Sequence, residues 1–215
     1  MKTARRRLLR QAGALGLLAP VAHAAVAKLP LGCTPSPQCR IDCGPTANTT
    51  AGPFYVANVA EGVDINPARA PGPPMRVSGT VYSADAKTPV RGARVEIWHA
   101  DAQGAYHPAD QGDVARFRRG EVNLRGVTRT DDQGRYAFTS IVPGHYGDRR
   151  RHLHWKVSAP GHRALTTQSY WLNERGTPRD QGDGTDRRVE ACRWVEFHEE
   201  GGHFVGVFDI VLRTG

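Results

Sequence analysis

The 215-residue sequence lacks a long apolar run, an internal repeat and a sustained helical period. A helix that crosses a bilayer needs about 20 consecutive apolar residues, and the main apolar stretch, residues 12–22, is shorter than this. Without a 3.6-residue period, a helical bundle is not predicted. With these features missing, we predict a β-rich domain that does not span a membrane.

The first 24 residues have the composition of an export signal. Five basic residues precede the apolar stretch and form a basic n-region, and Ala22-His23-Ala24 is a small-x-small cleavage site. The order Arg-Arg-x-Leu-Leu-Arg at 5–10 resembles a twin-arginine leader, whose route moves folded proteins. An ordinary secretory leader with extra arginines is the alternative. We expect residues 1–24 to be removed and the mature protein to be periplasmic or secreted.

The positive charge of the chain is concentrated in that leader. The formal net charge is +8, and five basic residues but no acidic ones precede position 25, so the remainder carries +3. A charge this small, with both signs interspersed, does not indicate nucleic acid or a membrane surface as a partner. It is compatible with a small anionic ligand.

Only four cysteines are present, namely Cys33, Cys39, Cys43 and Cys192. In an exported protein an even number indicates disulfides, here two with three possible pairings. The spacing of the first three matches no common zinc pattern, so a zinc cluster is the weaker alternative. We expect disulfides to join the N-terminal segment to the C-terminal part of the domain, with the pairing left open.

The remaining chain, about 190 residues, is enough for one domain with a substantial core. Residues 25–74 are rich in Pro, Gly, Thr and Asn, which predicts an extended arm. Residues 75–215 alternate between short apolar runs and turn clusters, which predicts an all-β sandwich. We interpret 175–188 as a surface loop. The predicted strands are 76–82, 93–99, 122–130, 135–141, 153–158, 164–172, 192–198 and 204–212.

Two histidines share a face of one of these strands. If residues 152–156 are extended, His152 and His154 point the same way while Leu153 points to the opposite side. Two imidazoles beside a phenol such as Tyr146 can begin a metal site. Two polar residues on the solvent face of a half-exposed strand are the alternative, so the function has to be judged from the neighbouring residues.

Tyrosines at strand ends supply the rest of a donor set. Tyr106 ends a loop after a strand, and Tyr146 follows Pro143-Gly144 at another strand end. A phenol has a pKa near 10 and binds as phenolate only to a strong Lewis acid. Ferric iron favours anionic oxygen donors, whereas zinc or copper would need the tyrosines less. The combination therefore favours Fe(III).

Other polar residues have simpler interpretations. We expect His99 to be structural and His198 and His203 to flank a polar turn. Packing roles, with satisfied hydroxyl groups, are expected for Tyr82, Tyr136 and Tyr170. The arginines at 116, 118, 119 and 125 are interpreted as a solvated face.

The motifs together resemble the intradiol ring-cleavage dioxygenases, the non-haem ferric enzymes that open catechols between the hydroxyl-bearing carbons. The resemblance covers most of the chain after the leader, and the short gap between Tyr146 and His152 is similar to the compact, secreted branch. The motifs are Thr50-Ala-Gly-Pro-Phe-Tyr55, Val95-Glu-Ile-Trp-His-Ala-Asp101 with Tyr106, Tyr136-x-Phe138, Ile141-x-Pro-Gly-x-Tyr146, Arg149-x-x-His152-Leu-His154 and Gln168-x-Tyr170.

The resemblance implies roles for individual residues. Four residues match the iron ligands of the family, namely Tyr106, Tyr146, His152 and His154. Tyr146 matches the tyrosine that leaves the metal when substrate binds. Arg149 matches the arginine that stabilises negative charge on the substrate ring, and Gln168 matches a glutamine that lines the active site. Thr128 departs from the family, which often has glutamine near this position.

The implied reaction uses a catecholic substrate and O₂ and yields a muconate-type diacid without an external reductant. The identity of the catechol and a homo-oligomeric state stay open. A non-enzymatic alternative is the transthyretin-like β-sandwich, which Val77-x-Gly79-x-Val81 and Pro143-Gly144-x-Tyr146 also resemble. That module does not predict Tyr106, Arg149, the two histidines and Gln168 in this order, so the iron site is favoured.

Overall fold

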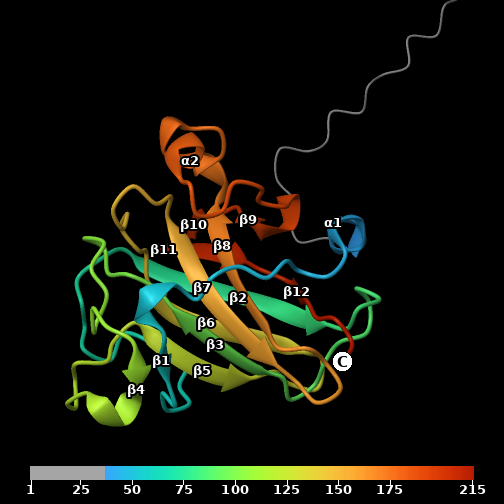
Figure 1. Ribbon diagram of the computed structural model, residues 1–215, viewed down its shortest axis with the longest axis horizontal. Coiled ribbons are helices and arrows are strands. Elements are labelled where there is room, and N and C mark those ends of the chain that lie inside the picture. Colours follow the sequence, from blue (N-terminus) through green and yellow to red (C-terminus); the bar gives the residue numbers. More distant parts are fainter. Residues whose placement is uncertain (1–36) are drawn as a thin grey trace, which may run out of the picture.

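The computed structural model describes residues 37–215, so the expected leader at 1–24 and Cys33 lie outside the described residues. Two five-stranded sheets pack face to face, and the predicted all-β sandwich is confirmed (Figure 1). No helix among residues 37–215 is long and apolar enough to cross a membrane.

The first sheet has the strand order β5-β3-β7-β8-β9. All pairs are antiparallel except β8 with β9. Strand β7 lies in the middle, with both of its edges paired, and carries the site described below on one face. The bounds are β3 Arg94–Trp98, β5 Arg125–Arg129, β7 His152–Ser158, β8 Leu165–Trp171 and β9 Trp194–Val195.

The second sheet is built around the nine-residue strand β2. Strand β6 pairs antiparallel with one edge of β2, and β11 and β12 pair in parallel with the other edge. Strand β10 pairs with β11 through a turn at 201–202, as the polar turn in the sequence predicted. The bounds are β2 Pro74–Tyr82, β6 Arg135–Ile141, β10 His198–Glu200, β11 His203–Val207 and β12 Ile210–Val211.

The core between the sheets comes from alternate residues of each strand. Val77 and Phe138 of the second sheet meet Ile97 and Trp155 of the first, and all four are at most 1% exposed. At about 25 cal/mol per Å² of apolar area, each large side chain buried here contributes roughly 2 kcal/mol. The opposite face of the first sheet is therefore free to hold polar groups, provided that other segments cover it.

The segment before β2 provides that cover. It contains helix α1, the 3-10 turn η1 and the short strand β1, which pairs with β4. Ala51, Phe54 and Tyr55 pack against Trp98 and Tyr106 on the outer face of the first sheet. The bounds are α1 Pro37–Cys43, η1 Gly52–Phe54, β1 Val56–Ala57, β4 Gly112–Asp113 and η2 Val114–Arg116.

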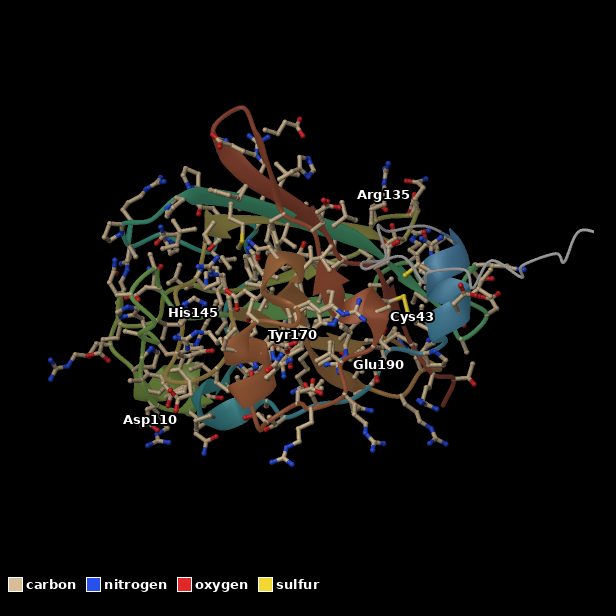
Figure 2. The ribbon with its side chains drawn as sticks, turned by 90° about the horizontal axis from the view of Figure 1, so that it is seen from above. Cys43, Asp110, Arg135, His145, Tyr170 and Glu190 are labelled. Carbon is tan, nitrogen blue, oxygen red and sulfur yellow. A yellow bond between two sulfur atoms is a disulfide. The ribbon has the colours of Figure 1, made fainter. Side chains whose placement is uncertain are left out.

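A disulfide joins the start of the described chain to its C-terminal part. Cys43, at the end of α1, is bonded to Cys192, with a Cα–Cα distance of 6.3 Å (Figure 2). The link closes a sequence separation of 149 residues. It holds α1 against the 3-10 turn η4, Ala191–Arg193, beside β9.

Two strand predictions and one loop prediction need correction. The stretch predicted as strand 192–198 forms η4 and only the two-residue β9, and 204–212 is split into β11 and β12. The segment 175–188 is not simply a surface loop, because it contains helix α2, Pro178–Gly182, and brings Asp183 to 2% exposure. The polar composition of the segment predicted exposure to solvent. In the structure its acidic residues point inward because they form ion pairs with buried arginines.

Candidate metal centre and active site

The site lies on the outer face of the first sheet, along the central strand β7. Leu153 and Trp155 face the core, so His152 and His154, which alternate with them, face the opposite way, as the alternation predicted. These histidines are nevertheless 4% and 2% exposed, because the segment before β2 and two loops cover them. The interpretation as solvent-facing polar residues is therefore wrong.

Three donor atoms converge in this covered space. The hydroxyl oxygen of Tyr106 lies 3.0 Å from Nε2 of His154 and 3.3 Å from Nε2 of His152. The ring of Tyr146 stands edge-on to that of Tyr106, with 5.6 Å between the ring centroids. The structure thus brings together all four residues that the sequence predicted as metal ligands.

The backbone fixes which nitrogen of His152 is available. Its Nδ1 lies 2.7 Å from the carbonyl oxygen of Arg150, and a carbonyl only accepts, so Nδ1 carries the proton. The lone pair of Nε2 consequently faces Tyr106. Burial lowers the pKa of His152 to about 4, with the nearby charge of Arg149 adding to the effect. The ring is therefore a neutral ligand at physiological pH.

His154 is held by packing. Its ring stacks on Trp98 of β3, with 4.9 Å between centroids and an interplanar angle of 8°. On the other side lies Gly52, at φ +67°, where an added Cβ would sit 3.3 Å from Cε1 of His154. Burial, followed by the charge of His152, holds the pKa of His154 well below its usual value.

The loop that carries Tyr106 is organised by Asp101. One carboxylate oxygen accepts hydrogen bonds from the backbone N–H groups of Gln103 and Ala105, both at 2.9 Å, and the other contacts Nε2 of His107 at 2.7 Å. The ring of Tyr106 stacks on Phe54, with 4.2 Å between centroids. The phenol is thus presented to the histidines by a turn of fixed shape.

The donor set fits a cation of high charge. Burial raises the pKa of Tyr106 well above its usual value, although the charges of Arg149 and Arg125 oppose this. A phenol in such a place gives up its proton only to a strong Lewis acid. Two neutral imidazole nitrogens and a phenol oxygen within hydrogen-bond distance of one another are ligands for a metal ion with those properties.

Arg149 stands at the edge of this centre in a fixed position. Its Nε donates to Asp183 at 2.8 Å, and one terminal nitrogen donates to Oε1 of Gln168 at 2.6 Å. Gln168 is fully buried on β8, directly opposite His154, and donates to the carbonyl oxygen of Thr50 at 2.9 Å. The structure therefore joins the two predicted substrate-contacting residues to each other and to strand β7, which carries His152 and His154.

Comparison with known proteins shows which family the chain belongs to. Residues 50–214 match a family model described as dioxygenase. Catechol 1,2-dioxygenase 2 from Acinetobacter lwoffii is 36% identical over 156 residues, which are 63% of this chain and 53% of that protein. 6-Chlorohydroxyquinol 1,2-dioxygenase from Cupriavidus pinatubonensis is 34% identical over 193 residues, 79% of this chain and 65% of that protein.

Among solved structures, a dioxygenase domain from Streptomyces sp. SirexAA-E, part of a fusion with a carbohydrate-binding protein, has a TM-score of 0.65 and 29% identity. The match covers 80% of this chain and 99% of that domain. The chain belongs to the intradiol ring-cleavage dioxygenase family. It spans about half the length of the Acinetobacter relative. Because the family is shown, the alternative of a transthyretin-like binding module is not favoured.

One residue near the site was placed wrongly from sequence. Arg125 is not on a solvated face but 6% exposed, and its guanidinium donates to the carbonyl oxygens of Phe54, His107, Pro108 and Asn123. Burial lowers its pKa to about 10, so it stays cationic. It ties the covering segment to the Tyr106 loop. The arginines before it in the sequence suggested a charged surface. The glycine that follows it in β5 was the one local sign of close packing.

Three of the residues expected to be structural, His99, Tyr136 and Tyr170, have polar groups with hydrogen-bond partners. His99 is fully buried, with Nδ1 2.6 Å from the carbonyl oxygen of Ala100 and Nε2 2.8 Å from the hydroxyl of Ser140. Tyr136 donates to the carbonyl oxygen of Phe208. The hydroxyl of Tyr170 lies 2.8 Å from Asp186 and 2.9 Å from Gln168, so Tyr170 supports the site from behind.

Proposed function

We propose that the chain is a non-haem Fe(III) intradiol dioxygenase that cleaves a catechol-type ring with O₂ to a muconate-type diacid. Four residues would hold the iron, namely Tyr106, Tyr146, His152 and His154. The observation that carries the proposal is the convergence of the Tyr106 hydroxyl on both histidine Nε2 atoms in a buried space. Family membership supports the reaction class.

Ferric iron suits this donor set better than other metals. Two phenolates offset most of a charge of +3, which matters where water is excluded. Zinc sites are instead completed by imidazole, thiolate or carboxylate groups, and a buried phenol would stay protonated beside zinc. The pairing of two tyrosines with two neutral histidines therefore favours Fe(III).

The bound iron would supply a Lewis acid that both hydroxyl oxygens of a catechol could bind, which would make the ring reactive toward O₂. Tyr146 is 39% exposed while Tyr106 is 4% exposed, so Tyr146 is the tyrosine free to move when substrate arrives. On leaving, its phenolate oxygen can take the proton of a substrate hydroxyl. Tyr106, stacked on Phe54, stays in place.

Arg149 and Gln168 would contact the substrate. A guanidinium is always cationic and presents fixed donors, so Arg149 stabilises negative charge that develops on the ring. The names of the relatives state catechol and 6-chlorohydroxyquinol as their substrates. We propose a related diphenol here, with O₂ as the second substrate.

A visible absorption spectrum of the purified, iron-loaded protein tests the proposal. Tyrosinate-to-ferric charge transfer should give a broad band in the blue-green region, and anaerobic addition of catechol should shift it to longer wavelength. Tyr106→Phe should weaken the band and remove catechol-dependent O₂ uptake. Tyr82→Phe is the matched control, because Tyr82 stacks under Arg40 away from the site.

A protein that stays colourless after iron loading, and takes up no O₂ with catechol, would refute the iron centre. If the protein were coloured but its absorption band did not shift on addition of catechol, the iron centre would stand and only the proposed substrate class would be wrong. Equal loss of colour in Tyr106→Phe and Tyr82→Phe would show that the band does not report on this site.

We further propose that the protein is exported, through a leader at 1–24, to the periplasm or beyond. The Cys43–Cys192 bond supports an oxidising compartment, because such bonds rarely persist in the cytosol. Cell fractionation and N-terminal sequencing of the mature protein test this. Replacing Arg5 and Arg6 by lysine should block export by the twin-arginine route but not by the ordinary secretory route.

A further inference from the structure

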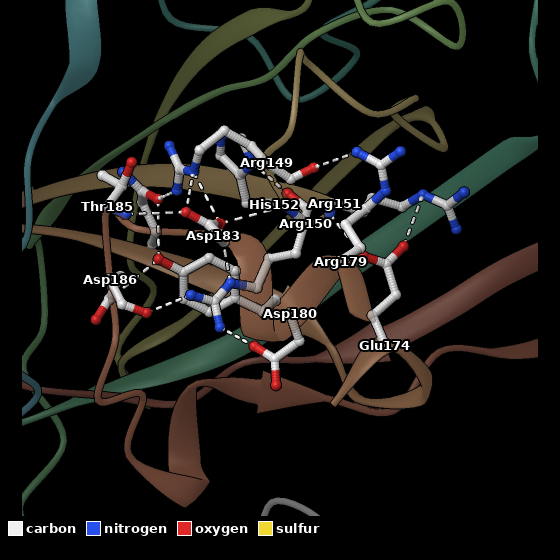
Figure 3. Close-up of polar contacts among 12 residues, drawn as sticks. Arg149, Arg150, Arg151, His152, Glu174, Arg179, Asp180, Asp183, Thr185 and Asp186 are labelled. Carbon is white, nitrogen blue, oxygen red and sulfur yellow. Dashed lines mark hydrogen bonds and ion pairs between the residues drawn. The ribbon is translucent and has the colours of Figure 1, made fainter. Parts of the chain in front are cut away.

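One buried carboxylate, that of Asp183, lies between two neighbouring arginines of the site. It accepts from Nε of Arg149 at 2.8 Å, and from Nε and the backbone N–H of Arg150 at 3.0 and 3.2 Å (Figure 3). The side chain of Asp183 is fully buried. No sequence motif singled out this residue, which lies 34 positions beyond Arg149.

The segment around α2 delivers this carboxylate to a fixed place. Thr177 caps the start of α2 by accepting from the N–H of Asp180, and the N–H of Asp183 closes the helix on the carbonyl oxygen of Arg179 at 3.1 Å. The N–H of Thr185 also donates to Asp183 at 3.1 Å. The backbone therefore holds the carboxylate from both sides.

Asp183 is ionised in this environment. Burial alone would raise the pKa of its carboxyl group, but hydrogen bonds from Arg149 and Arg150 outweigh burial and hold the pKa below its usual range. A buried, hydrogen-bonded ion pair has a defined geometry, and removing one partner leaves the other uncompensated.

Arg149 depends on this pair for its orientation. It lies in the loop between β6 and β7, and its N–H donates to the carbonyl oxygen of Tyr146, the exposed tyrosine. Asp183 holds Nε and Gln168 holds one terminal nitrogen, so two of the three guanidinium nitrogens are fixed. Without Asp183, only Gln168 would restrain a long and flexible side chain.

We propose that Asp183 is a positioning residue, which sets the Arg149 guanidinium before the substrate charge develops. The inference rests on the proposed function for its catalytic consequence. Groups that hold such residues in place typically contribute 10- to 100-fold to activity.

A double-mutant cycle on the iron-loaded protein tests the proposal, with catechol as substrate and O₂ uptake as the rate. Asp183→Asn should lower kcat about 10- to 100-fold and leave the visible spectrum of the resting protein unchanged. In an Arg149→Gln background, Asp183→Asn should change kcat less than about twofold, because its target is gone. If Asp183→Asn lowered kcat by the same factor in wild type and in Arg149→Gln, the proposal would be overturned.

Glu190→Gln is the matched control. Glu190 also pairs with a buried arginine, Arg193, at 2.6 Å and lies in the same part of the chain, but it does not contact Arg149. The kcat of the Glu190→Gln variant should stay within about twofold of the wild-type value. A loss equal to that of Asp183→Asn would show a general effect of loosening this segment, and would overturn the specific role.

A measurement on the metal-free protein separates this inference from the proposed function. In a ¹⁵N NMR spectrum, the Nε–H of Arg149, assigned by its loss in Arg149→Gln, should exchange slowly in wild type and at least tenfold faster in Asp183→Asn. Equal exchange rates would overturn the positioning role. An iron-loaded wild type without activity would refute the function alone, and the exchange rates would still decide whether Asp183 holds Arg149.

Discussion

The hydroxyl oxygen of Tyr106 lies 3.0 Å from Nε2 of His154, although the two residues are 48 positions apart in the chain. The histidine comes from the centre of a sheet, and the tyrosine comes from a loop that folds over it. This contact defines the place where a cation would bind, so the stability of the contact and the affinity for iron should depend on the same neighbours.

Replacing His154 by alanine should lower iron affinity about 10- to 100-fold. The substitution removes one of the two imidazole nitrogens and leaves the Tyr106 phenol without its nearest partner. Titration of the metal-free protein with Fe(III) under a competing chelator measures the change. His162→Ala, in an exposed turn beside Ser83, should bind iron as wild type does; a similar loss there would contradict the assignment.

Gly52→Ala should harm both stability and the metal centre. Gly52 has φ +67°, and its added Cβ would press on Cε1 of His154 at 3.3 Å. Gly44 has a similar φ of +62° with no atom within 4 Å of the added Cβ. Both alanine variants should lose about 1 kcal/mol of unfolding free energy from the strained φ, as measured in urea.

Only the Gly52 variant should also lose iron affinity, because only its Cβ displaces a ligand. If Gly44→Ala weakened iron binding as much, the effect would come from backbone strain in general. If neither variant weakened it, the packing of Gly52 against His154 would have no role in the site.

Arg125→Gln should destabilise the protein by about 3 kcal/mol. The guanidinium satisfies four carbonyl oxygens, two of them in the Tyr106 loop, and glutamine can donate to no more than two. Urea unfolding gives the free energy, and limited proteolysis should show faster cleavage in the loop. The exposed Arg118→Gln should stay within about 0.5 kcal/mol of wild type.

Stability should fall in mild acid, and His99 should account for part of the loss beside His152 and His154. Burial, with the charge of Arg125 adding to it, lowers the pKa of His99 to about 4, while the unfolded residue titrates near 6.5. Between these values the unfolded chain binds a proton that the folded chain does not. The contribution is present above pH 6.5 and is lost as the pH falls toward 4, by about 3 kcal/mol at most.

Urea unfolding of the metal-free protein at pH 7.5, 5.5 and 4.5 measures this loss. His99→Gln removes the titrating group, so its free energy of unfolding should fall less steeply than that of wild type across this range. His162→Gln should follow the wild-type slope. Parallel curves for wild type and His99→Gln would show that His99 does not titrate as expected.

Local patterns were sufficient to predict most strands and the residues that lie together at the candidate site. The alternation at 152–154 indicated a shared face for the histidines, because side chains in any strand alternate. The match of 135–141 with β6 follows from the same rule and from the turn residues before it. The tyrosines were found by chemistry, since a phenol beside imidazoles implies a hard, highly charged cation.

Burial of charge could not be read from the same patterns. Arg125 and Asp183 occur in polar stretches, and their local sequence is that of a solvated surface. Each is buried because partners distant in the chain meet it: four backbone carbonyls for Arg125, and Arg149 with Arg150 for Asp183. Such partners are brought together by the packing of loops on the sheet.

The sequence by itself determined the sandwich and the candidate donor residues, because strand period and side-chain type are local properties. Only the tertiary structure decided that the outer face of the first sheet is covered. It also decided that Arg149 is clamped by Asp183. The physical reason is that desolvation and ion pairing depend on which distant segments share a volume, and no local pattern specifies that.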